Sequence, residues 1–154
     1  MVRSGRKWCK FMYFGNFEHT MDAKGRICIP AKFREALGTV VYITKGMDGC
    51  LNLYSQSDFE KILAELSSLS FNNPQSRAHI RANAGSTDEC EIDKQGRLQL
   101  PNKLLVRENL GKEITIVGAI DHLEIWDRAR WNEYFDNAYS NDEKNAESLD
   151  SLKR

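Results

Sequence analysis

Two five-residue stretches, residues 22–26 and 93–97, carry the side chains best suited to chemistry in this sequence. Both have the form Asp-x-x-Gly-Arg, so each places a carboxylate four positions before a guanidinium and includes one lysine. An arginine donates two hydrogen bonds at once to a phosphate or to the edge of a guanine, and a lysine adds a point charge to such a site. The basic side chains concerned are Lys24 and Arg26 in the first stretch and Lys94 and Arg97 in the second.

The same two stretches have the composition of tight hairpin turns. A carboxylate at the start of a turn, here Asp22 or Asp93, accepts backbone N–H groups of the residues that follow it. Gly25 and Gly96 can supply the positive φ that such a turn needs. Residue types alternate with period two on both sides of the turn, as in strands with one buried face. We therefore assign these Asp and Gly residues to shaping two hairpin tips.

The two tips belong to an internal repeat. Each is followed by an apolar alternation that ends at a proline, then by a short helix that ends at a glycine, then by two strands. The spacing between the copies is 71 at Asp22 and 73 at the end of the short helix, where residues 106–111 align with residues 33–38. In this alignment Val106 is the counterpart of Phe33.

The predicted fold class is α+β and mainly β. Each half is a βαββ unit too small to bury a core alone, so two halves are expected to pack into one pseudo-symmetric barrel with flanking short helices. The polar residues after Asn141 predict a disordered tail or a frayed helix end. The expected segments are a basic N-terminal extension at 1–11, a first repeat at 16–62, a helical linker at 63–87, a second repeat at 88–134 and a polar C-terminal tail at 135–154.

Charge is unevenly distributed although the net charge is zero. Residues 1–45 contain nine Lys or Arg and three acids, whereas residues 110–154 contain six Lys or Arg and ten acids. This asymmetry predicts one basic and one acidic face, or alternatively charged flexible ends. No apolar run approaches the ~18 residues of a membrane span, and the basic start lacks the apolar segment of a secretory signal. We therefore expect a cytoplasmic protein that does not contact membranes.

Neither a metal site nor a catalytic site is predicted. The cysteines form no Cys-x-x-Cys pair and have no histidine at a ligand spacing, which argues against zinc. The histidines have no acid or nucleophile placed with them, so we expect no enzyme activity, no cofactor and no small-molecule substrate. The residues in question are Cys9, Cys28, Cys50, Cys90, His19, His79 and His122.

Four segments, residues 19–34, 43–51, 93–101 and 123–126, resemble the MraZ family of bacterial transcriptional regulators, whose gene heads the division and cell wall cluster. The resemblance implies two SpoVT-AbrB swapped-hairpin domains and a ring-shaped homo-oligomer. It also implies binding to double-stranded DNA at repeated promoter sites, and hence association with the nucleoid. The chain departs from the family pattern in two places. Residues 1–11 precede the position where family members usually begin, and Gln99 puts a polar side chain into the alternating strand.

Carried over residue by residue, the resemblance implies that the two tips face DNA, with Lys32 and Arg34 as flanking contacts. The DNA contacts that it implies in the tips are Lys24, Arg26, Lys94 and Arg97. Simpler interpretations stay open. Each Asp–Arg pair could serve solely to hold its own hairpin together, which stabilises the fold by about 0.2–1 kcal/mol for an exposed pair. The two helix cations could simply form a solvated face. An oligomeric adaptor that binds proteins through the same tips is the alternative function. The sequence leaves repression and activation equally open.

Overall fold

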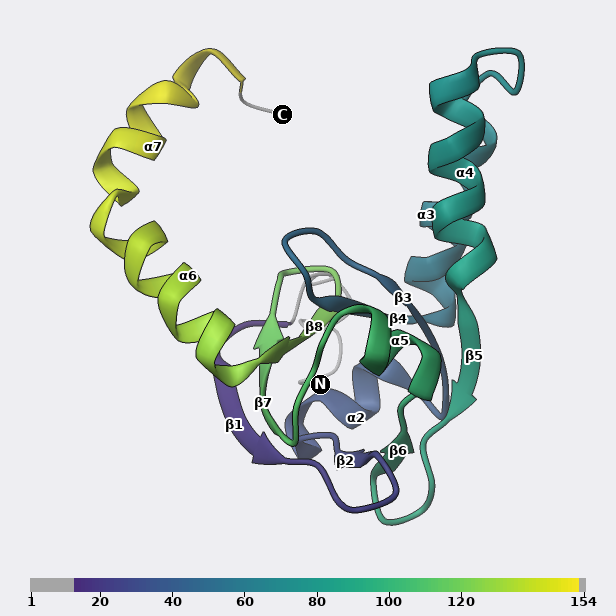
Figure 1. Cartoon of the computed structure of the whole chain (residues 1–154), viewed down its shortest axis with the longest axis vertical. Helices are drawn as coiled ribbons and strands as arrows, with labels where there is room; N and C mark the ends of the chain where they lie inside the picture. The colour runs from purple at the N-terminus through teal and green to yellow at the C-terminus, as the bar shows by residue number, and fades with distance from the viewer. Residues whose placement is uncertain (1–12, 153–154) are drawn as a thin grey trace, which may run out of the picture.

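The computed structural model describes residues 13–152, so the predicted extension at 1–11 lies outside the described residues. The chain forms a mixed α+β fold in which all strand pairs are antiparallel (Figure 1). The strands are β1 (Asn16–Thr20), β2 (Arg26–Cys28), β3 (Val40–Lys45), β4 (Leu51–Ser55), β5 (Asp88–Glu91), β6 (Arg97–Gln99), β7 (Glu113–Gly118) and β8 (Leu123–Asp127). The helices are α2 (Ala31–Leu37), α3 (Gln56–Ser67), α4 (Pro74–Ser86), α5 (Asn102–Arg107), α6 (Arg128–Ser140), α7 (Asp142–Ser148) and the 3-10 turn η1 (Asp150–Leu152).

The two halves of the repeat exchange strands. β1 of the first half pairs with β7 of the second half, and β5 of the second half pairs with β3 of the first. The other two pairings between the halves join equivalent strands, β2 with β6 and β4 with β8. Within each half, β3 pairs with β4 and β7 with β8. Each half therefore completes its sheet with the first strand of the other half.

The predicted barrel is not closed in the part of the chain that the structure describes. The main sheet has the order β1-β7-β8-β4-β3-β5, which leaves β1 and β5 at its edges, and β2 and β6 form a separate two-stranded sheet. β2 and β6 are only three residues long, and Pro30 and Pro101 follow shortly after them. A proline has no N–H group to extend a ladder, so these strands cannot bridge the two edges.

The core lies between the main sheet and the β2–β6 pair. Ile27 and Leu98 stand opposite each other in β2 and β6 and are 1% and 0% exposed. They belong to the same buried cluster as Ile43 of β3 and Ile116 of β7. The alternation read from the sequence thus places one face of each short strand in the core.

The short helices show that the repeat alignment at Val106 is wrong. Phe33 of α2 is 1% exposed, and its buried counterpart in α5 is Leu104, at 4%. Val106 is 70% exposed. The two extra residues of the second copy lie at the end of α5, where Asn109 has a φ of 55° and ends the helix in a left-handed conformation.

Two helical arms leave the body on the same side, and both hairpin tips lie at the opposite end (Figure 1). One arm is the α3–α4 hairpin and the other is α6 followed by α7. The segment after Asn141, predicted to be disordered or frayed, continues as α7, with Asp142 and Glu143 in its first turn, where acidic side chains favour a helix. Within residues 13–152 no helix is long and apolar enough to cross a membrane.

The corrected alignment of the two repeats can be tested by truncating the two candidate counterparts of Phe33 in α5, Leu104 and Val106. Leu104→Ala removes a buried side chain and should lower the free energy of unfolding by about 2–5 kcal/mol. Val106→Ala removes a side chain that is 70% exposed and should change it by less than about 0.5 kcal/mol. Urea unfolding at one fixed protein concentration measures both; equal effects would contradict the register.

Candidate nucleic-acid interface

The first tip is organised around the carboxylate of Asp22. Its Oδ1 accepts the backbone N–H groups of Lys24 and Arg26, both at 2.9 Å, and its Oδ2 accepts the Nε–H of Arg26 at 2.7 Å. The N–H of Gly25 donates to the carbonyl of Asp22 at 3.0 Å, and Gly25 has a φ of 80°, which glycine adopts readily. Asp22 therefore shapes the turn and orients the guanidinium of Arg26 with one side chain.

The second tip repeats this geometry. Asp93 Oδ1 accepts the backbone N–H groups of Gln95 and Arg97 at 2.9 Å, and Oδ2 accepts the Nε–H of Arg97 at 2.9 Å. Gly96 donates its N–H to the carbonyl of Asp93 at 2.9 Å and has a φ of 81°. Asp93 and Gly96 thus lie in the second turn as Asp22 and Gly25 lie in the first.

Both tip carboxylates are held in their charged form. The backbone N–H of Arg26, followed by its side chain, lowers the pKa of Asp22 from the ordinary 3.8 to about 2. The backbone N–H of Arg97 likewise lowers the pKa of Asp93. Because a hydrogen bond to a carboxylate favours ionisation, each Asp stays negative and keeps its hold on the arginine across the physiological pH range.

Pairing of β2 with β6 brings the two tips side by side. The N–H of Ile29 donates to the carbonyl of Gly96 at 2.8 Å, and the N–H of Leu100 donates to the carbonyl of Gly25 at 3.0 Å. Each tip is therefore bonded to the strand that leaves the other tip. The sequence predicts two related tips, and the structure joins them into one surface.

The two arginines lie on the same outward face of this pair. Arg26 is opposite Gln99 and Arg97 is opposite Cys28, while the middle residue of each strand is buried. Arg26 and Arg97 are consequently diagonal neighbours, which in a regular antiparallel pair lie about 7–8 Å apart. Among the described residues, only the Nε of each guanidinium donates a hydrogen bond, so the terminal nitrogens are available to a ligand.

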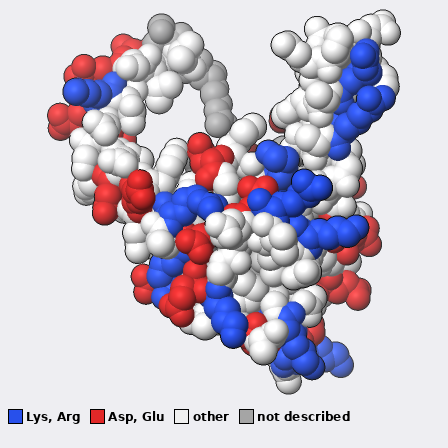
Figure 2. Space-filling view, in the orientation of Figure 1, with Lys and Arg blue, Asp and Glu red and all other residues white. Residues whose placement is uncertain are grey.

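Lys24 and Lys94 are exposed within the tips. Figure 2 shows Lys and Arg side chains gathered at this end of the body. We name the surface formed by Lys24, Arg26, Lys94 and Arg97 the tip patch.

Arg34 lies against the second tip, next to the tip patch, in a contact that sequence reasoning missed. Its Nε donates to the carbonyl of Ile29 at 2.9 Å, and its guanidinium lies so close to Gly96 that a Cβ there would overlap it. Beside the first tip the corresponding space is taken by the amide of Gln99, which donates to the carbonyl of Lys24. The two tips are thus alike in their turns and different in their support. The contacts of Arg34 with Gly96 and of Gln99 with Lys24 cross between the halves, and no local sequence pattern signals them.

Lys32 has a different environment from the tip residues. Its Nζ lies 4.5 Å from the ring centre of Phe14, 5.1 Å from that of Phe17 and 5.2 Å from that of Phe33. The cation is attracted by these ring faces. The structure therefore places Lys32 over an aromatic cluster made by Phe33 of α2, Phe17 of β1 and Phe14, which precedes β1.

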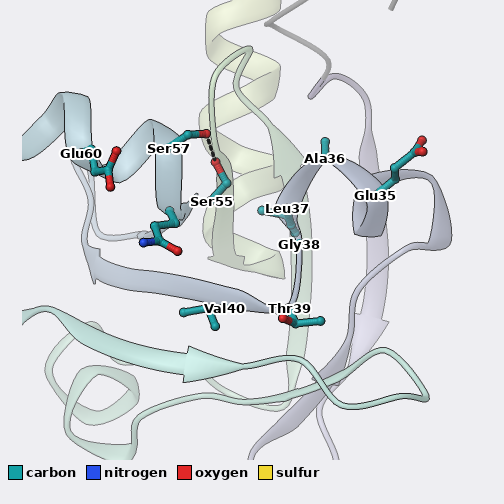
Figure 3. Close-up of a pocket in the computed structure, with 10 residues that line it drawn as sticks. Glu35, Ala36, Leu37, Gly38, Thr39, Val40, Ser55, Ser57 and Glu60 are labelled. Carbon is teal, nitrogen blue, oxygen red and sulfur yellow. Dashed lines mark hydrogen bonds between the residues drawn. The ribbon is translucent and has the colours of Figure 1, made fainter. Parts of the chain in front are cut away.

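Two surface hollows are present beside these elements. One, of about 410 Å³, lies between the end of α2, the start of β3 and the start of α3, and includes Ser55 and Ser57, whose hydroxyls are 3.4 Å apart (Figure 3). The other, of about 480 Å³, lies between the first tip and α5. Neither contains a histidine or a cysteine.

The histidines serve local structure. His19 Nε2 accepts the backbone N–H of Cys28 at 3.1 Å. His122 lies between Asp121, at 2.8 Å, and Glu124, at 3.4 Å. Burial disfavours protonation of His122, but its hydrogen bonds to these carboxylates outweigh it and raise its pKa. Within the described range, no three His, Cys, Asp or Glu residues are arranged to hold a metal ion.

Comparison with known proteins assigns the chain to a family. Residues 12–82 and 84–152 each match the family model described as "MraZ protein, putative antitoxin-like". The transcriptional regulator MraZ of Carboxydothermus hydrogenoformans is 44% identical over 138 residues, which cover 90% of this chain and 96% of that protein. This chain belongs to the MraZ family. The MraZ regulator of Thermoanaerobacter sp. (strain X514) is 43% identical over 141 residues, 92% of this chain and 99% of that one.

A solved structure gives only a weak similarity. The solution structure of PHS018 from Pyrococcus horikoshii matches with a TM-score of 0.30 and 15% identity, over 75% of this chain and 89% of that chain. This similarity carries no argument about the fold. The assignment to the MraZ family depends on the sequence matches alone.

Support of the second tip by Arg34 can be tested with a double mutant. Gly96→Ala should cost about 1–2 kcal/mol of stability from its left-handed backbone, with an added cost because Arg34 must move away. In an Arg34→Ala background that added cost should disappear. Gly25→Ala is the matched control, because its penalty should be the same with and without Arg34. Urea unfolding of the single and double variants gives the coupling energy, and a value of zero would contradict the contact.

The tip hydrogen bonds predict the titration of Asp22. Its pKa is about 2 in the folded protein against 3.8 ordinarily, so the stabilising effect is present above about pH 4 and is lost as the pH falls towards 2. Arg26→Ala should raise this pKa only part of the way, because the backbone N–H of residue 26 remains. Carboxyl chemical shifts in an NMR titration measure both values; a wild-type midpoint near 3.8 would contradict the geometry.

Proposed function

We propose that this protein is a DNA-binding transcriptional regulator that uses the tip patch to contact double-stranded DNA. Two facts support the proposal: the chain belongs to the MraZ family, and its relatives carry the name transcriptional regulator. The structural observation that supports the tip patch as the DNA-contacting surface is the pairing of β2 with β6, because it places Arg26 and Arg97 on one outward face. The protein then acts in the cytoplasm, at the nucleoid, without catalysis and without a cofactor.

The tip patch suits DNA because its arginines are oriented before binding. Each Asp fixes the Nε of its arginine and leaves the terminal nitrogens to donate in parallel to a phosphate or to a guanine edge. A side chain that is already ordered loses less conformational entropy on binding. Lys24 and Lys94 add phosphate contacts, and Arg34 supplies a further positive charge behind the second tip.

One tip patch contacts few phosphates, so we propose that repetition supplies the affinity. A ring-shaped homo-oligomer presents several patches, which bind at the same time to repeated sites in the promoter of the division and cell wall gene cluster. Binding of the first patch raises the effective concentration of the next patch at its site, so the weak contacts add. The exchange of β1 and β5 between the halves supports the swapped-hairpin architecture of two SpoVT-AbrB repeats, at 16–62 and 88–134. In this proposal residues 63–87 link the repeats and 135–154 follow them.

The proposal is tested by removing the arginines one at a time. Arg26→Ala and Arg97→Ala should each weaken binding to a duplex from upstream of the protein's own gene by about 10-fold or more. Each change should also lower the slope of log affinity against log salt by about 1 for every phosphate that the variant no longer binds. Fluorescence anisotropy at several salt concentrations measures both quantities.

Lys61→Ala is the control, because it removes an exposed cation on α3 that pairs only locally with Asp58. It should leave the affinity unchanged. Full affinity of Arg26→Ala at physiological salt would overturn the role of the tip patch. A wild-type affinity that does not change with salt would favour the alternative, an oligomeric adaptor that binds protein partners through the tips.

A further inference from the structure

The outward face of the β2–β6 pair carries four side chains, and two of them differ between the halves. Arg26 of β2 corresponds to Arg97 of β6 at the repeat spacing of 71. Cys28 corresponds in the same way to Gln99. The register sets Arg26 opposite Gln99 and Cys28 opposite Arg97. The arginines thus follow the internal symmetry, whereas an amide stands at one end of the face and a thiol at the other.

The symmetric arginines alone give the tip patch no direction along a duplex. Two guanidiniums related by a two-fold axis make the same contacts when the DNA is turned end for end. Copies related by rotation around a ring all point the same way, so they need sites that are read in one direction. The tip lysines are placed unequally, but a point charge suits phosphates, which carry no sequence information. A direction therefore needs a base-reading group that differs between the two ends.

The amide of Gln99 is held in place beside the first tip. Its Nε2 donates to the backbone carbonyl of Lys24 and lies 3.3 Å from where a Cβ at Gly25 would be. The contact with a carbonyl oxygen also fixes which end of the amide carries the nitrogen, because two acceptors do not pair. Gln99 is therefore ordered by the protein before any ligand binds.

This amide keeps hydrogen-bonding groups for a ligand. A glutamine amide has two N–H donors and one carbonyl oxygen that accepts. Among the described residues, Gln99 makes no side-chain hydrogen bond other than the one to Lys24. One N–H and the oxygen Oε1 are left over, and Gln99 is exposed, so a ligand can reach the side chain.

The remaining groups match the edge of an adenine. In the major groove adenine presents N7 as an acceptor and its N6 amino group as a donor, and a glutamine amide can bond to both at once. Guanine presents two acceptors there and cytosine one amino donor, so neither pairs with an amide as completely. A thiol such as that of Cys28 is only a weak donor and a weak acceptor, so it does not make this pair.

Gln99 stands close enough to Arg26 to read a neighbouring base pair. The N–H of Leu100 donates to the carbonyl of Gly25 at 3.0 Å, so these two residues form a hydrogen-bonded position of the ladder. The next position, Arg26 opposite Gln99, is therefore a non-hydrogen-bonded pair, in which Cα atoms lie about 4.5 Å apart. Stacked bases are about 3.4 Å apart along a strand, so the two side chains can reach adjacent base pairs.

We propose that Gln99 is a specificity-determining residue that reads an adenine beside the position contacted by Arg26. Its Oε1 accepts the N6 amino group of the adenine, and its second N–H donates to N7. Because Cys28 does not make this contact at the other end of the face, the amide also gives the tip patch a direction on the DNA. The inference rests on the proposed function and adds to it the identity of one base.

Base substitution in the DNA tests this role. A duplex from upstream of the protein's own gene is changed one base pair at a time, and fluorescence anisotropy gives the affinity of the wild type and of Gln99→Ala for each duplex. The wild type should bind about 10-fold more weakly when one A·T pair is replaced by G·C. Gln99→Ala should lose the discrimination at that pair and keep it at every other.

A change of one atom in the DNA locates the contact. Replacing the adenine of that pair by 7-deazaadenine removes the N7 acceptor and keeps the base pair. It should weaken binding of the wild type and leave binding of Gln99→Ala unchanged. Equal weakening of the two proteins would overturn the contact.

Gln95→Ala is the matched control. Gln95 is also an exposed glutamine, but it lies in the turn of the second tip and not in β6. This variant should keep the wild-type discrimination at the A·T pair. Loss of that discrimination in Gln95→Ala and not in Gln99→Ala would overturn the assignment.

The outcomes also separate base reading from a role in holding the first tip. If Gln99 only supports the turn, Gln99→Ala weakens binding to every duplex by the same factor. That result, or a wild type without a preference for adenine, would overturn this inference and leave the proposed function intact. A wild-type affinity that depends neither on Arg26 and Arg97 nor on salt would overturn both.

Discussion

The pairing of β2 with β6 joins the two halves of the molecule and sets the position of both tips. Ile27 and Leu98 stand opposite each other at its centre and are fully buried. The strands are too short to be stable alone, and each gains its hydrogen-bond partners from the other half of the chain. The same pairing turns both arginines outward and lets each tip bond to the strand that leaves the other. The tip patch and the buried core thus lie on opposite faces of one short ladder.

The turns were predictable because their chemistry is local. Asp22 and Asp93 bond only to the four residues after them, and a glycine with positive φ is a requirement of the turn itself. The sequence left open whether each Asp–Arg pair ties its hairpin or serves a ligand. The geometry makes the two compatible, since the tie uses the Nε of the arginine and leaves its terminal nitrogens to a ligand. Local pattern could therefore indicate the turn of each tip, but neither the contacts that support it from the other half nor its use.

Features that depend on the meeting of the two halves were harder to predict. The helix alignment followed the terminal glycines and paired Val106 with Phe33, whereas burial pairs Leu104 with Phe33, because the extra residues of the second copy fall after the buried turn of α5. The predicted barrel is not closed among the described strands, because β2 and β6 are short, are followed by prolines and form a separate sheet. Arg34 at Gly96 is a contact between side chain and backbone from different halves, which no periodicity within either half can indicate.

Strand exchange also decides when the chain can fold during synthesis. β1 leaves the ribosome early, but its partner β7 is made only after most of the chain, because Phe17 pairs with Ile116. Closing so long a loop is entropically costly and slows folding, as in other chains dominated by distant contacts. Until then the first half exposes an unpaired strand edge. The second half of a neighbouring nascent chain carries the same β7, so strand exchange between two chains competes with closure within one chain until β7 has been made.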